Sequence, residues 1–186
     1  MSLGSHRTSI LGVLAVAVAF LAIAAVASAK NYSSGGASYV PPPKKATVRR
    51  GKAIAPRGAP NKVKKIIAAA NKIVTKPYRY GGGHGSWNDS AYDCSGSVSF
   101  ALHGAHLIDR PMDSTEFMSW ARSGAGKWVT VYANSGHAFM MVAGLRFDTG
   151  YRDSYGAQHG AKPGSGPRWG KPRPTSGFVS RHPGTI

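Results

Sequence analysis

Apolar residues in the middle of the chain recur first at helical spacing. Asn61 is a good N-cap, the apolar positions after it share one face, and Pro77 ends the pattern, which predicts a first helix. Polar residues that favour helix starts stand before two further segments with the same kind of spacing. These segments predict helices at about 94–107 and 114–122.

The pattern changes beyond residue 126. Three short apolar stretches, 127–133, 137–143 and 145–149, are typical of strands, and Ser135-Gly136 and Gly144 mark the turns between them. Connections this short favour an antiparallel meander. Helices followed by a run of strands predict an α+β domain, in which N-terminal helices pack on a small antiparallel β-sheet.

Residues 1–29 have the three parts of a secretory signal peptide. A short basic start leads into residues 10–26, which carry no polar side chain, and Ala27-Ser28-Ala29 is a small-x-small cleavage pattern. We expect cleavage after this pattern and export of the remaining chain. The alternative is an uncleaved membrane anchor, since the apolar run lies at the short end of the range of about 17–25 residues that span a bilayer.

Basic residues dominate the composition: 24 Lys and Arg against 7 Asp and Glu give a formal charge of +17. Residues 30–60 are basic and rich in Pro, Gly and Ser, without a periodic apolar face, which predicts a flexible linker. Such a run is either a solvated spacer or a segment that adheres to anionic polymers of a bacterial envelope. Residues 151–186 are expected to form an irregular basic extension that packs on a domain of residues 61–150.

Cys94 is the single cysteine of a chain that we expect to be exported. If Asp93 caps the second helix, Cys94 lies in its first turn, where unpaired amides and the helix dipole favour a thiolate. A thiolate is the reactive form of a cysteine nucleophile. The alternative is a small buried apolar residue, as free cysteines often are. The Gly-rich loop before Cys94 and its polar neighbours favour the nucleophile.

A cysteine nucleophile needs a base and a group that orients it. His137 opens the second predicted strand, and a strand end holds a side chain more rigidly than a loop does. Asp148 ends the next strand, and a turn at Gly144 would bring these two strand ends side by side. The order of Cys94, His137 and Asp148 along the chain is that of a cysteine-peptidase triad. A turn-capping role for Asp148 is the alternative.

Three motifs together resemble one known family. They are Pro77-Tyr78-Arg79-Tyr80-Gly81-Gly82, then Asp93-Cys94-Ser95-Gly96, and then Gly136-His137 at a strand start. The chain resembles the NlpC/p60-type cell-wall cysteine peptidases, which have a papain-like core, over about residues 62–150. The resemblance implies Cys94 as nucleophile, His137 as base and a polar residue on the next strand. Asp148 matches that third residue by position and departs from its usual type, which is His, Asn or Gln.

The resemblance also implies residues that hold the peptide. Tyr78 belongs to the first motif, Asp93 and Ser95 flank the nucleophile, and Ser114 falls in the place of the family's Leu-Pro-x-x-Ser segment. Trp87 is our own candidate for the groove, because it lies in the Gly-rich loop. The family's Pro-Gly-Asp-Leu segment before the His strand is absent here, so the shape of the groove should differ.

These observations predict a secreted, cell-wall associated peptidoglycan hydrolase that cuts amide bonds in stem peptides. We expect a monomer without metal or cofactor, whose partners are peptidoglycan and anionic wall polymers rather than nucleic acid, for which we find no recognition motif. The same triad could serve an N-acetylmuramoyl amidase or an acyl transferase, and a non-catalytic cationic wall-binding protein is a third possibility. A zinc site at His103, His106 and Asp109 is the weakest alternative, since paired histidines on a helix surface are common.

Overall fold

A computed structural model describes residues 45–150 and 166–186. The predicted signal peptide and the first part of the predicted linker lie outside the described residues. Within them the chain folds as three helices and two antiparallel sheets, so the predicted α+β class is confirmed. No helix in the described part of the chain is both long enough and apolar enough to cross a membrane.

The helices lie close to where the sequence predicts them. Helix α1 spans Asn61–Ile73, α2 spans Cys94–His103 and α3 spans Ser114–Phe117. The last two are shorter than expected. Gly104 follows α2 and lies so close to α1 that an added Cβ would collide with the side chain of Ala69. This glycine therefore allows the two helices to pack closely at the end of α2.

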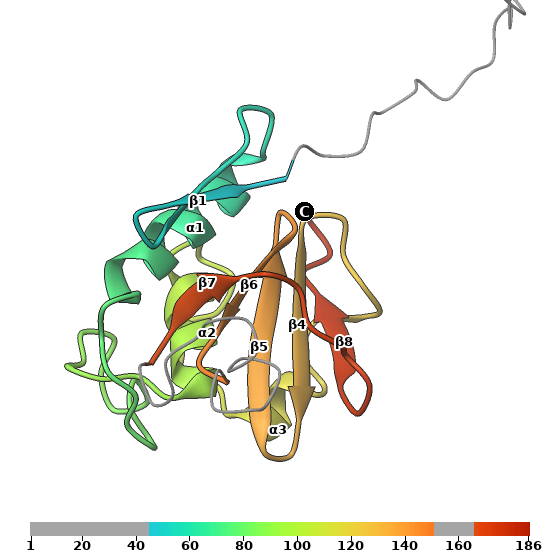
Figure 1. The fold of residues 1–186 in the computed structure, drawn as a ribbon. Coiled ribbons are helices and arrows are strands. Elements are labelled where there is room, and N and C mark those ends of the chain that lie inside the picture. The colour runs from blue at the N-terminus through green and yellow to red at the C-terminus, as the bar shows by residue number, and fades with distance from the viewer. Residues whose placement is uncertain (1–44, 151–165) are drawn as a thin grey trace, which may run out of the picture. The chain divides into compact units, whose positions relative to one another are not determined.

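The main sheet has six antiparallel strands in the order β3-β8-β4-β5-β6-β7 (Figure 1). Its centre is the predicted meander, in which β4, β5 and β6 pair consecutively. The strands are β3 (Arg122–Ser123), β4 (Val129–Asn134), β5 (His137–Val142), β6 (Leu145–Asp148), β7 (Arg168–Gly170) and β8 (Val179–His182).

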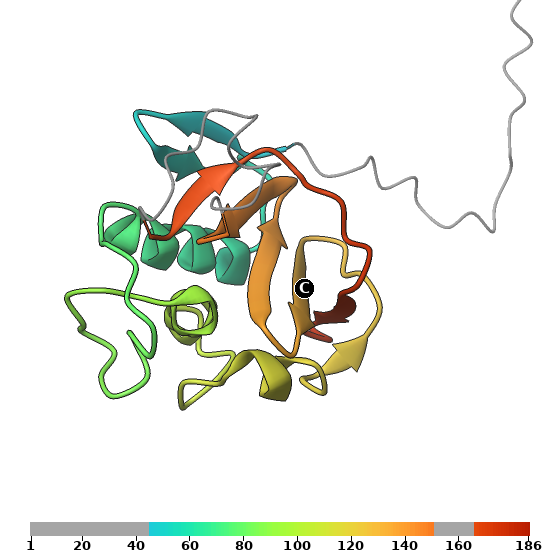
Figure 2. The same cartoon turned by 60° about the horizontal axis from the view of Figure 1, so that its bottom comes forward.

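The two faces of this sheet have different neighbours. Alternate residues of the meander, among them Val131, Met140 and Phe147, belong to the apolar core that also includes the buried faces of α1 and α2. Figure 2 shows both helices on this side of the sheet. The residues between them in sequence, such as Phe139 and Arg146, point to the opposite face, which we call the outer face.

Residues 47–54 differ from the predicted flexible linker. Thr47–Arg49 and Lys52–Ile54 form the hairpin β1–β2, with Arg50 and Gly51 at its turn in left-handed conformations. The side-chain amide of Asn71 on α1 binds both the N–H and the C=O of Ala53. Small buried alanines let this hairpin approach the domain, so the linker prediction is wrong for this part of the chain.

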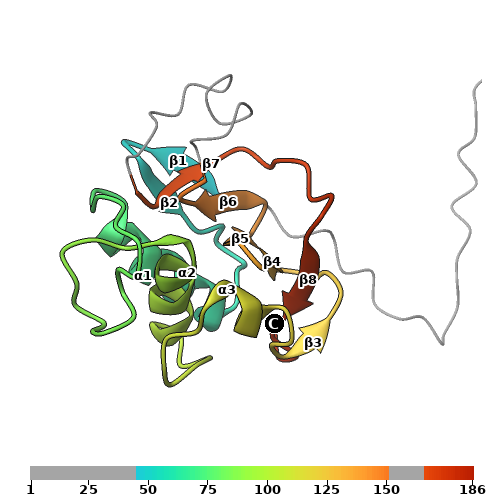
Figure 3. The same cartoon turned by 90° about the horizontal axis from the view of Figure 1, so that it is seen from below.

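The C-terminal residues differ from the predicted irregular extension as well. Residues 168–170 and 179–182 form β7 and β8, which pair with β6 on one side of the sheet and with β4 on the other. The connection between them, residues 171–178, runs along the outer face, opposite the helices (Figure 3). Residues 166–186 are therefore part of the domain, as the packing prediction required, but they are regular where they join the sheet.

Candidate active site

The Gly-rich motif and the cysteine motif are hydrogen-bonded to each other. The N–H of Gly81 donates to Asp93 Oδ2 at 3.0 Å, and the N–H of Asp93 donates to the carbonyl of Gly82 at 3.1 Å. A Cβ on Gly96 would collide with that same carbonyl oxygen. The cysteine motif therefore needs glycine at position 96 for a close backbone contact rather than for loop flexibility.

Asp93 is the N-cap of α2, as predicted. Its Oδ1 accepts from the N–H of Gly96 at 2.7 Å, which satisfies one of the unpaired amides at the helix start. Cys94 is consequently the first residue of α2, where the helix dipole favours a negative charge.

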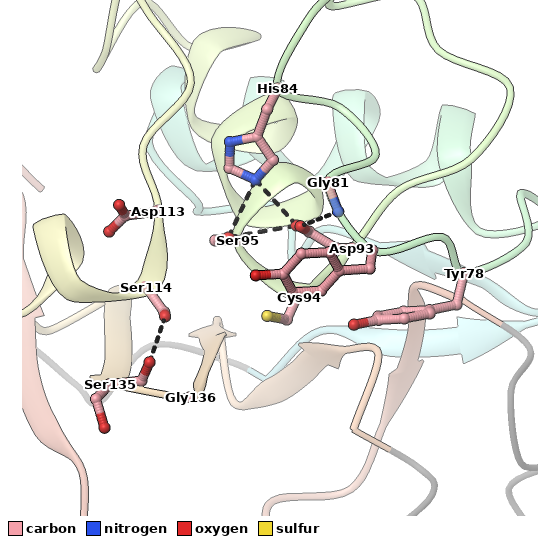
Figure 4. Close-up of a pocket in the computed structure, with 11 residues that line it drawn as sticks. Tyr78, Gly81, His84, Asp93, Cys94, Ser95, Asp113, Ser114, Ser135 and Gly136 are labelled. Carbon is pink, nitrogen blue, oxygen red and sulfur yellow. Dashed lines mark hydrogen bonds and ion pairs between the residues drawn. The ribbon is translucent and has the colours of Figure 1, made fainter.

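Cys94 opens into a pocket of about 340 Å³. The walls come from the loop at 78–84, the start of α2, residues 113–114 and the β4–β5 turn at 135–136. The sulfur of Cys94 and the hydroxyl of Tyr78 point into the same space (Figure 4). A ligand in this pocket would therefore meet the thiol directly.

His137 connects the cysteine to a buried carboxylate. Its Nε2 lies 2.8 Å from Oδ1 of Asp148, and its ring also interacts electrostatically with the side chain of Cys94. Burial lowers the pKa of His137, but the hydrogen bond to Asp148 and the interaction with Cys94 outweigh burial and raise the pKa from 6.5 to about 9. The structure therefore brings together the three residues that the sequence singled out.

Asp148 is completely buried and surrounded by positive groups. Burial raises the pKa of its carboxyl, but the hydrogen bond and charge of His137, together with the charge of Arg146, hold that pKa below its usual range. Arg146 Nη1 lies 3.2 Å from Oδ2, and Arg173 Nη1 lies 3.6 Å from the same oxygen. A buried carboxylate stays ionised only when it is paired in this way.

The predicted peptide-binding residues divide into two groups. Tyr78, Asp93, Ser95 and Ser114 all line the pocket. The carboxylate of Asp93 already accepts hydrogen bonds from backbone amides and neighbouring side chains, so its first task is to shape the wall. Trp87, our candidate for the groove, does not line this pocket.

Trp87 packs on the domain instead. Its ring stacks on that of His103 in α2, with centroids 3.9 Å apart and the planes within 5° of each other. An indole gains more from such a contact than from an exposed loop position. His103 also contacts the carbonyl oxygen of Ile108 through Nδ1, and the described residues hold no group of three His, Cys, Asp or Glu that could bind a metal ion.

The pocket contains residues that the sequence analysis did not select. The ring of His84 reaches Asp93 Oδ1 at 3.1 Å and Ser95 Oγ at 3.2 Å, as Figure 4 shows, and Asp113 lies on the opposite wall. The signal for His84 was its position in the loop between two motifs that must lie together.

Arg146, which does not line the pocket, could also have been found from the sequence, because it lies two residues before Asp148 on the same face of a strand.

Comparison with solved structures finds similar folds. The P60 domain of an antigen from M. avium subspecies paratuberculosis is 16% identical, with a TM-score of 0.45, and the match covers 64% of this chain and 93% of that one. The peptidoglycan hydrolase RipB from Mycobacterium tuberculosis is 18% identical, with a TM-score of 0.46, over 66% of this chain and 68% of that one.

A hypothetical invasion protein of Mycobacterium tuberculosis is 19% identical, with a TM-score of 0.45 and 64% of this chain covered. The match spans 61% of that protein's length, so the present chain corresponds to part of it. No family model and no curated protein sequence matches the chain.

Proposed function

We propose that this protein is a secreted cysteine peptidase that hydrolyses amide bonds in the stem peptides of peptidoglycan. The observation that carries the proposal is the arrangement of Cys94, His137 and Asp148: His137 pairs with Asp148 and interacts electrostatically with Cys94, whose thiol opens into the pocket. The motifs around Cys94 and His137 add the likeness to NlpC/p60-type peptidases, which implies the wall peptide as substrate.

The chemistry begins with a proton on His137. With a pKa of about 9 this imidazole is protonated at neutral pH, and its Nε2 pairs with Asp148. The Cys94 thiolate attacks the carbonyl carbon of the scissile amide and forms a tetrahedral intermediate. The N–H of Cys94, at the start of α2, is the candidate donor to the oxygen that becomes negative.

Breakdown of the intermediate requires the same imidazole. His137 gives its proton to the amine nitrogen, the carbon–nitrogen bond breaks, and the acyl group remains on Cys94 as a thioester. The now neutral His137 takes a proton from water, whose oxygen attacks the thioester and releases Cys94. Asp148 keeps the ring oriented in both steps and stabilises its charged form.

The substrate bond is the finer part of the proposal. The resemblance implies an endopeptidase that cuts after the D-glutamyl residue of the stem peptide. The pocket fits a short polar peptide segment, because hydroxyl groups of Tyr78, Ser95 and Ser114 line it. The triad of Cys94, His137 and Asp148 could instead cut the bond between sugar and peptide or transfer an acyl group. The products distinguish these reactions.

The first experiment uses the protein from Lys30 onward and its Cys94→Ala variant on purified peptidoglycan, with mass spectrometry of the soluble products. Peptide fragments released by the parent protein and not by the variant are the expected result, and their masses identify the bond. Ser97→Ala is a matched control, because Ser97 lies one turn further along α2 and its hydroxyl binds the carbonyl of Cys94 outside the pocket. Equal release by the parent protein and Cys94→Ala would contradict the proposal.

A specific observation also favours binding to anionic wall polymers. Arg49 and Lys52 lie directly opposite each other in the β1–β2 hairpin, with Arg50 at the turn, and all three are exposed. Like charges in opposing positions destabilise a strand pair, and the sequence has no acidic residue before Asp89 to balance them. A polyanion would relieve this repulsion.

This second activity is tested by cosedimentation with wall sacculi that keep or lack their anionic polymers. Replacing the three hairpin cations by Gln should weaken binding to the former and reduce its salt dependence. The matched control replaces three exposed cations elsewhere in the domain: Arg122, Lys127 and Lys171. Equal loss in the control would mean that net charge, and not the hairpin, determines adhesion.

A further inference from the structure

The C-terminal connection between β7 and β8 brings a cation to the carboxylate behind His137. This connection, residues 171–178, passes over the outer face of the sheet, where His137 and Asp148 lie (Figure 3). Arg173 of this connection has its Nη1 at 3.6 Å from Oδ2 of Asp148. It belongs to a segment that sequence patterns predicted to be irregular.

The two oxygens of Asp148 have separate partners. Oδ1 lies 2.8 Å from Nε2 of His137 and accepts from the N–H of Gly150 at 2.7 Å. Oδ2 faces the guanidinium groups of Arg146 and Arg173. Rotation of the carboxylate would break contacts at both oxygens, so the arginines on Oδ2 keep Oδ1 directed at His137.

Arg173 is itself held on both sides. Its guanidinium carbon lies 5.5 Å from the ring centroid of Phe139 on β5 and 5.7 Å from that of Phe178 in the connection. Phe178 in turn contacts the ring of His137, with centroids 6.2 Å apart. One cluster of side chains therefore packs against the base, its carboxylate and the cation.

The backbone around Arg173 is preorganised by its sequence. Pro172 and Pro174 flank it, and a residue that precedes proline is restricted to extended conformations. The segment thus loses little conformational entropy when it is fixed over the sheet. The side chain of Arg173 is 16% exposed, whereas that of Arg146 is 1% exposed. Arg173 can therefore be replaced without opening the core.

We infer that Arg173 is a positioning residue, through which the C-terminal connection holds Asp148 and so fixes the orientation of His137. This inference rests on the proposed function and deepens it, because it makes residues far from Cys94 in sequence part of the same site. The charged groups around His137 are then Cys94, Asp148, Arg146 and Arg173.

The test compares Arg173→Ala with Arg173→Lys, which keeps the charge and loses the planar fork. In peptidoglycan hydrolysis, kcat of Arg173→Ala should fall by up to about 100-fold with KM unchanged, since a small misplacement of a reacting group has effects of this order. Guanidinium ions added at millimolar concentration should restore activity to Arg173→Ala, while sodium ions at the same ionic strength should not. Lys171→Ala, an exposed cation of the same connection, is the matched control and should leave kcat unchanged.

A second readout does not need activity. The ring of His137 is followed by NMR as a function of pH in the parent protein and in both variants. Its pKa should fall from about 9 towards 6.5 in both variants, because the carboxylate that accepts its hydrogen bond, Asp148, is no longer held in place. Thermal unfolding checks that each variant is folded.

The possible results separate the two proposals. An unchanged pKa of His137 and an unchanged kcat in both variants would overturn the role of Arg173, while hydrolysis by the parent protein would leave the peptidase intact. A rise of the pKa in Arg173→Ala with no change in Arg173→Lys would also overturn it, since Arg173 would then act through its charge alone. A parent protein without hydrolytic activity in which the pKa falls in both variants would support the positioning role and contradict the peptidase.

Discussion

The two faces of the central sheet are both buried, and they are buried in different ways. On the inner face, Val131, Met140 and Phe147 pack with the helices and gain stability from apolar contact. On the outer face, Arg146 and Asp148 are as inaccessible to water, yet they are charged and paired. Burial of a charge pair adds little stability, because desolvation offsets the attraction, so the outer face is built to hold a geometry.

A single strand contributes to both faces. In β5, Met140 points inward, whereas His137 and Phe139 point outward, because side chains alternate along a strand. A shift of the strand by one residue would exchange the two sets. The apolar core therefore fixes the register that places His137 beside Asp148.

The largest expected effect comes from the outer face. Replacing His137 by Ala should reduce kcat for peptidoglycan hydrolysis by about 10⁴-fold, because the proposed mechanism loses both its acid and its base. The fold should remain, since this side chain lies at the start of β5 and not in the inner core. Product analysis and thermal unfolding measure the two quantities. Hydrolysis at the parent rate would show that another residue is the base.

The second largest effect is a loss of stability when the charge pair on the outer face is broken. Asp148→Asn leaves the guanidinium of Arg146 buried without its anion, which should cost about 3–5 kcal/mol of unfolding free energy. Chemical denaturation measures it, and the exposed Asp109→Asn is the control, expected within about 0.5 kcal/mol of the parent. If Asp148→Asn lowered the unfolding free energy as little as the control does, the charge of Asp148 would not be needed to keep Arg146 buried.

The inner face should respond in stability alone. Met140→Ala removes a fully buried side chain from the apolar core and should lower the unfolding free energy by about 2–5 kcal/mol. At temperatures well below unfolding, kcat should stay at the parent value. A large loss of kcat in a folded Met140→Ala protein would show that the two faces are coupled more tightly than their alternation suggests.

The smallest effect is a dependence of stability on pH. The folded protein holds a proton on His137 up to about pH 9, whereas the unfolded chain releases it near 6.5, so the folded state binds more protons in this window. The unfolding free energy should therefore fall as the pH rises from about 6.5 to 9, by a few kcal/mol at most, since one pKa unit corresponds to about 1.4 kcal/mol. Denaturation at several pH values should show this slope in Met140→Ala and not in His137→Ala.

Local patterns in the sequence were sufficient for the frame of the site. The apolar spacing after Asn61, the cap at Asp93 and the alternation around the turn at Gly144 predicted α1, the start of α2 and the meander. Each of these signals depends on neighbours within a few residues, so it can be recognised without the rest of the chain. Cys94, His137 and Asp148 were candidates for the same reason, as residues at the ends of predicted elements.

The tertiary structure decided what covers and completes that frame. Strands β7 and β8 are three and four residues long, and they exist because a sheet with open edges was available to pair with them. Trp87 stacks on His103 of α2, a partner distant in sequence that only the fold brings close. Which residues line the pocket likewise depended on how loops meet.

The sequence by itself thus determined the helices, the meander and the three candidate catalytic residues, because periodicity, capping and turns are local properties. Only the tertiary structure decided that Arg146 and Arg173 meet at one oxygen of Asp148 and that the C-terminal connection covers His137. Contacts of that kind join segments far apart in the chain, and no local pattern specifies them. Such contacts form because a buried charge or an unpaired strand edge is unfavourable without a partner. Only the complete fold brings that partner close.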